Sequence, residues 1–139
     1  MEGKMNTNIW TTGMDVRAKL STLWIFVMFN LIFSEFHRLL QPGFLEEVMT
    51  GTISGVQMSQ EVLLLGAVVL EIPIAMALLS RVLKYRLNRW ANIIAGAMTI
   101  AIVLFNMSAD LDNIFFSTIG VVAMLLVVWY AWRWHRQQA

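Results

Sequence analysis

The stretch EVLLLGAVVLEIPIAMALLSRVLKYRLNRWANIIAGAMTIAIVLF, residues 61–105, decides the fold that we predict for this chain of 139 residues. It holds two long apolar runs joined by a short basic segment. An apolar helix of roughly 20 residues crosses the ~30 Å hydrocarbon core of a bilayer. Backbone groups in lipid must be satisfied within their own segment, which favours helices over strands. We therefore predict membrane-spanning helices at about 62–83 and 89–107, with Asn88 as the N-cap of the second.

Two further apolar runs flank this stretch and predict spans at about 20–40 and 112–134. The expected fold is all-α: an integral membrane four-helix bundle that forms a single domain over residues 1–139. The connection between the first two spans has an apolar helical face opposite two glutamates, which predicts a short amphipathic interfacial helix at about 43–50. A hydrophobic content of 58% and a mean hydropathy of +0.66 also exceed those of an ordinary soluble domain.

Basic residues fall almost entirely on one side of the predicted spans. Arg38 is the exception, and the others are Lys4, Arg17, Lys19, Arg81, Lys84, Arg86, Arg89, Arg133 and Arg136. The positive-inside rule therefore predicts a multi-pass protein of the cell inner membrane with both termini in the cytoplasm. Short basic segments beside a membrane favour anionic lipid headgroups, so we expect the lipid bilayer as a partner and no nucleic acid. A single orientation also means that any homo-oligomer is parallel.

Glu71 is the strongest candidate for a functional residue, because it lies near the middle of the second predicted span. An ionisable group at that depth costs roughly 2.5 to 3.5 kcal/mol on insertion scales and usually faces the interior of the bundle. One hypothesis is a carboxylate that carries a proton or binds a cation. The alternative is a hydrogen-bonded glutamate that only holds the helices together.

Polar residues on the neighbouring spans are candidate partners for Glu71. On the third span three of them recur at seven-residue spacing, and on the first span three follow at offsets of four and three, so each set shares a helical face. The candidate ligand- or proton-binding residues are Glu71, Asn30, Thr99, Ser34, His37, Asn92 and Asn106. The two stripes predict either an interior polar path from the midplane to the outer surface or ordinary hydrogen bonds between helices.

We expect no catalytic residue, metal site or cofactor. His37 is the one histidine on the predicted outer side, no HxxxH spacing occurs, and the chain has no cysteine. No phosphate loop or nucleophile elbow is present. Aromatic residues near the predicted cytoplasmic ends indicate a membrane-interface belt: Trp24, Trp90, Trp129, Tyr130, Trp132 and Trp134.

Three stretches carry a resemblance to known proteins: LSTLWIFVMFN, EIPIAMALLSRVLKYRLNRWANIIAG and VVWYAWRW. They resemble an uncharacterised family of small four-span bacterial membrane proteins. The likeness covers most of residues 18–134, and the segment 71–96 is its most specific part. It implies a bacterial cytoplasmic membrane and a four-helix fold, and it carries over no catalytic residue. In size and layout the chain is also similar to the DoxX-like four-span proteins, some of which associate with oxidoreductases.

Three functions follow as hypotheses. The first is binding or transport of a small hydrophobic or cationic compound, with Glu71 as the central group. The second is a non-catalytic subunit or partner of a membrane complex, as the DoxX-like layout suggests. The third is an intramembrane enzyme acting on a lipid or quinone through His37, Glu35 and Glu71, which requires Glu71 and His37 to share a cavity.

Overall fold

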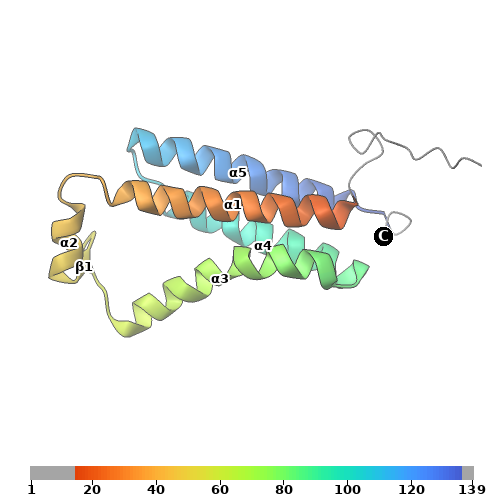
Figure 1. The fold of residues 1–139 in the computed structure, drawn as a ribbon, viewed down its shortest axis with the longest axis horizontal. Coiled ribbons are helices and arrows are strands. Elements are labelled where there is room, and N and C mark those ends of the chain that lie inside the picture. The colour runs from red at the N-terminus through yellow and green to blue at the C-terminus, as the bar shows by residue number, and fades with distance from the viewer. Residues whose placement is uncertain (1–14, 136–139) are drawn as a thin grey trace, which may run out of the picture.

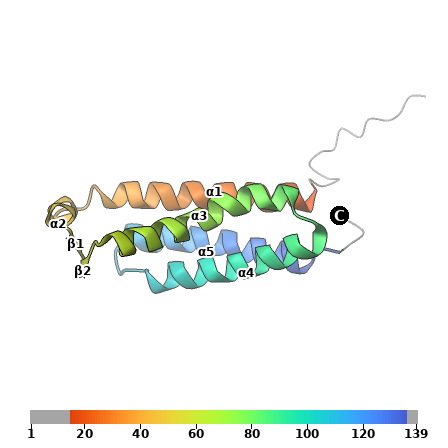
Figure 2. The same cartoon turned by 90° about the horizontal axis from the view of Figure 1, so that it is seen from below.

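The computed structural model of the protein describes residues 15–135. Its long helices are α1 (Val16–Arg38), α3 (Gln60–Val82), α4 (Tyr85–Phe105) and α5 (Leu111–Trp132). All four are long and apolar enough to cross a membrane, which confirms the predicted all-α four-helix architecture. They run alternately up and down along one axis, as Figures 1 and 2 show. The predicted basic residues Lys4 and Arg136 lie outside the described residues.

A short helix and a small hairpin connect α1 to α3. The helix is α2 (Phe44–Thr50), and the hairpin pairs β1 (Thr52–Ile53) with β2 (Val56–Gln57) in antiparallel register. The hairpin turn uses left-handed backbone at Ser54 (φ 50°) and Gly55 (φ 79°), as two-residue turns that match strand twist require. The sequence predicts no strand in this connection, so the hairpin is an addition to the predicted fold.

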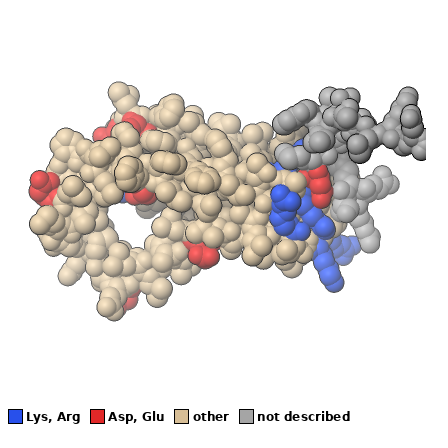
Figure 3. All heavy atoms as spheres, viewed as in Figure 1, with Lys and Arg blue, Asp and Glu red and all other residues tan. Residues whose placement is uncertain are grey.

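Charge separates along the axis of the bundle (Figure 3). Lysine and arginine gather where α1 begins and α5 ends, which we call the basic end. The opposite, acidic end carries α2, the hairpin and the loop from α4 to α5. At the basic end Arg89 donates from Nε to the carbonyl of Ala131 at 3.2 Å and from Nη2 to that of Trp132 at 3.1 Å. These bonds satisfy carbonyl groups that the last turn of α5 leaves open.

The tightly packed core lies in the half of the bundle next to the basic end. Leu20, Trp24, Val27, Met124 and Val127 are all fully buried there. Helices α4 and α5 approach closely at Gly96, where an added Cβ would stand 2.8 Å from Cγ2 of Val128. Two residues assigned to the aromatic belt, Trp24 and Trp134, are therefore core residues, since each is at most 1% exposed.

Helix α3 bends near its middle, and its first half leaves the bundle (Figure 1). Pro73 lies inside this helix and is buried against the bundle. A proline ring removes one helical hydrogen bond and clashes with the carbonyl four residues earlier, so the helix bends away from the side that carries the ring. Because Pro73 faces the bundle, residues 60–71 diverge from it. We call this segment the free half of α3.

Candidate functional site

Glu71 is exposed on the outer surface of the bundle and does not face its interior. It is the twelfth of the 23 residues of α3 and therefore lies near mid-height. At 100° per residue it points away from the face that buries Pro73, Met76 and Ser80. Within residues 15–135 it makes no side-chain hydrogen bond and no ion pair. The expected inward orientation of Glu71 is thus not found, because Pro73 takes the bundle-facing side of this turn.

Its predicted partners are occupied elsewhere. Asn30 donates from Nδ2 to the carbonyl of Phe116 at 2.8 Å and so links α1 to α5. Gly120 permits this approach, because a Cβ there would lie 3.3 Å from the same nitrogen. Thr99 and Asn106 donate to carbonyls four residues earlier in α4, at 2.8 Å in both cases. Side chains that bond back to their own helix build no route between helices, so the predicted polar path to Glu71 is absent from the described residues.

Asn92 belongs to a buried hydrogen-bond network near the basic end. Its Oδ1 accepts from Trp24 Nε1 at 2.7 Å and from the Ser80 hydroxyl at 3.2 Å. Its Nδ2 donates to the backbone carbonyl and to Oδ1 of Asn88, at 2.9 and 2.7 Å. Every polar atom of this amide has a partner, and the bonds join α1, α3 and α4. The network holds the bundle together and presents no free group to a ligand.

Asn88 shows where the sequence prediction of the third span went wrong. It is not the N-cap but a fully buried residue in the first turns of α4, which begins at Tyr85. Its Nδ2 donates to the carbonyl of Ser80 at 2.8 Å, at the end of α3. Asn88 thus acts at the C-terminal end of α3, where it satisfies a backbone carbonyl that the helix leaves without a partner.

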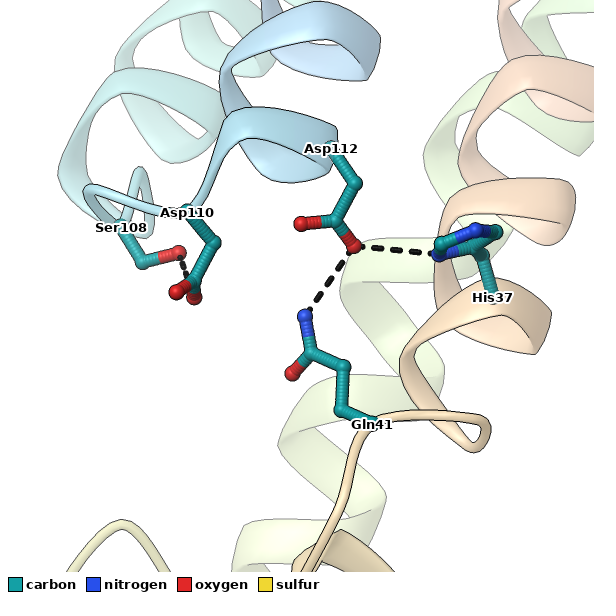
Figure 4. Close-up of polar contacts among 5 residues, drawn as sticks. All are labelled: His37, Gln41, Ser108, Asp110 and Asp112. Carbon is teal, nitrogen blue, oxygen red and sulfur yellow. Dashed lines mark hydrogen bonds and ion pairs between the residues drawn. The ribbon is translucent and has the colours of Figure 1, made fainter.

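At the acidic end, polar side chains from two helices and a loop meet around one carboxylate (Figure 4). Oδ2 of Asp112 lies 3.1 Å from Nδ1 of His37 and accepts from Nε2 of Gln41 at 3.1 Å. Ser108 and Asp110 form a separate pair beside it, at 2.9 Å. Of these residues only His37 was a sequence candidate. Gln41 and Asp112 could have been found, because each lies where a predicted span ends or begins at the same membrane surface.

The remaining candidates do not gather into one site. Ser34 is half-buried one turn before His37 on α1. His37 and Glu71 lie on different helices and at different heights, and His37 is engaged by Asp112. No cluster of three histidine, cysteine, aspartate or glutamate side chains that could hold a metal ion occurs among residues 15–135.

An opening between the free half of α3 and the bundle is the most unusual feature of the surface. Figure 3 shows it as a hole bounded by α1, the free half of α3, and α2 with the hairpin. Leu65 lies on the same face of α3 as Val69, Ile72 and Met76, yet Leu65 is 65% exposed whereas Met76 is 5% exposed. The wall that α3 contributes is apolar, because Leu65 and Val69 lie on the face that points towards the opening.

The opposite wall comes from α1. Ser21 donates its hydroxyl to the carbonyl of Ala77 at 2.7 Å, which shows which face of α1 points towards α3. Ile32 lies eleven residues later on that same face and is 53% exposed. The two helices therefore touch near the basic end and separate towards the acidic end, so that they form an apolar cleft.

A family model matches residues 7–139 of the chain. The chain belongs to DUF6326, a family of unknown function. This confirms that it is a member of an uncharacterised family with four apolar helices. No curated protein and no solved structure matches the chain. The likeness to DoxX-like proteins and the bacterial origin stay predictions, and membership of DUF6326 brings no known ligand or activity to the opening beside α3.

Proposed function

We propose that the protein is a membrane-embedded binding protein that takes up a small hydrophobic molecule from the bilayer into the opening beside α3. The observation that carries this proposal is the 65% exposure of Leu65 on a face that is buried further along the same helix. Two apolar walls held apart in hydrocarbon leave a space that is filled by a lipid chain or by another apolar molecule. Ligand sites are typically concave and mostly apolar, with a few polar groups that set orientation.

The polar groups at the acidic end indicate the kind of ligand. Glu46 and Glu47 on α2 and the carboxylate of Asp112 all lie at the acidic end. A ligand that suits both regions has an apolar part, which lies between Leu65 and Ile32, and a cationic or hydrogen-bonding head group, which lies near these acids. We therefore infer an amphiphile with a neutral or positively charged head.

The orientation in the membrane is part of this proposal. All described basic residues except Arg38 are found at the basic end or in the segments that adjoin it. The positive-inside rule then places this end in the cytoplasm of a bacterial cell, with both chain termini, and the opening in the outer leaflet. The half next to the basic end is closed by the packed core and the Asn92 network. The arrangement therefore supports binding from the outer leaflet rather than passage across the membrane.

Two matched substitutions test the proposal. Leu64 and Leu65 are 66% and 65% exposed and lie at the same height, but only Leu65 faces the opening. Native mass spectrometry of the protein released from mild detergent should show one retained small molecule in the parent and in Leu64→Trp. Leu65→Trp should lose it, because the indole fills the space between the walls. Equal retention in both variants, or no retained molecule in the parent, would refute the binding role.

A further inference from the structure

We propose that the face of α3 that points away from the bundle docks a second, parallel copy of this chain, with the two Glu71 side chains facing each other. The residues of this face recur at offsets of three and four, as in the a and d positions of a coiled-coil seam. The seam residues are Leu64, Ala67, Glu71, Ile74 and Leu78. Every one of them is exposed. This surface is distinct from the opening, which lies on the other side of the helix.

Glu71 is the reason that lipid alone is a poor neighbour for this face. The residue sits at the middle of a 23-residue apolar helix with no hydrogen-bond partner in the described part of the chain. Hydrocarbon offers neither donor nor acceptor, and intramembrane carboxyl groups typically pair with another polar group. The leucines of the seam, by contrast, are as well solvated by lipid tails as by protein. A polar partner at the depth of Glu71 is therefore the specific requirement of this surface.

A second copy meets that requirement without any other protein. Copies inserted by the same charge rule share one orientation, so a two-fold axis along the membrane normal brings Glu71 opposite Glu71 at equal depth. A carboxyl group is both an acceptor and, when it carries a proton, a donor, so a second carboxyl group is a chemically suitable hydrogen-bond partner for it. A single polar residue at an a position is also known to set register and oligomeric state. Ala67, one turn away, has a small side chain that allows the two helices to approach closely.

Cysteine cross-linking in liposomes tests this surface, since the chain has no cysteine of its own. Ala67→Cys places a thiol on the seam. Ala97→Cys is the matched control, because Ala97 is an exposed alanine on α4 at a similar distance from the acidic end. At a low protein-to-lipid ratio, oxidation should give a disulfide-linked dimer for Ala67→Cys and little for Ala97→Cys. Equal cross-linking at both positions, or none at Ala67, overturns the proposal.

Substitution of Glu71 tests whether the pair of carboxyl groups, and not apolar contact alone, stabilises the dimer. Single-molecule photobleaching of labelled protein in the same liposomes gives the dimer fraction against dilution. Glu71→Leu should weaken the dimer about 5- to 30-fold, the range expected for an interhelical polar contact of about 1–2 kcal/mol. Glu71→Gln replaces the carboxyl group with an amide of similar shape that has two donors and an acceptor, and it should stay close to the parent. An unchanged dimer in Glu71→Leu, or a Glu71→Gln variant as weak as Glu71→Leu, overturns the role of Glu71.

Discussion

Removal of the Asn92 amide is the sharpest test of how the bundle is held together. In Asn92→Ala three neighbouring side chains lose a partner: Trp24 Nε1, the Ser80 hydroxyl and Oδ1 of Asn88. Hydrogen bonds between membrane helices average about 0.6 kcal/mol, and two of the three lost bonds join different helices. Their loss predicts a free energy of unfolding lower by about 1 kcal/mol. The fully buried position also leaves a cavity, which moves the effect in the same direction.

Asn106→Ala is the matched control for this prediction. Asn106 is the C-cap of the same helix, and its amide also donates to the carbonyl four residues earlier, but it is exposed and bonds no other helix in the described part of the chain. Its substitution should change the free energy of unfolding by less than about 0.5 kcal/mol. Unfolding in mixed detergent micelles with increasing dodecyl sulfate, followed by tryptophan fluorescence, measures both variants. Equal destabilisation of the two would refute the structural role assigned to the network.

Three further predictions concern packing, shape and topology. Gly96→Ala should destabilise the bundle by about 1–3 kcal/mol, because the added Cβ would stand 2.8 Å from a valine methyl of α5. Gly66→Ala is the control and should not destabilise it, because no atom lies within 4 Å of the added Cβ. Thermal unfolding compares the two variants. Pro73→Ala should straighten α3 and slow the labelling of a cysteine introduced at Leu65, and an unchanged rate would show that the proline does not cause the bend. A reporter active only in the periplasm should give no signal when fused after Arg86, and a signal there would reverse the proposed orientation.

The sequence predicted the class of fold because long apolar runs in lipid permit little besides helices. It predicted less of the shape, since the bend of α3 depends on which side of the helix Pro73 occupies once the bundle forms. The inward orientation expected of Glu71 failed for the same reason. An intramembrane carboxyl group usually has a polar partner, but this expectation does not say whether the partner lies in the same chain.

Local patterns also hid the tertiary roles of polar and aromatic residues. A tryptophan near the end of a span, such as Trp24, is typical of an interface belt. Its burial depends on a hydrogen bond to Asn92, which lies on another helix. Asn88 has the usual sequence of an N-cap, but a bond to the carbonyl of Ser80 draws it inside. The hairpin was readable in principle, because Ser54 and Gly55 are common turn residues between two short β-prone pairs. The contact between Trp24 and Asn92 joins residues 68 positions apart, which no local pattern in the sequence reveals.

The divergence of α3 has a mechanical consequence for the membrane. One copy is broader at its acidic end than at its basic end, as Figure 1 shows. The two leaflets therefore give up different areas of lipid to each molecule, with the larger area on the side of the acidic end. A wedge of this form relieves bending stress in a membrane that is convex on that side.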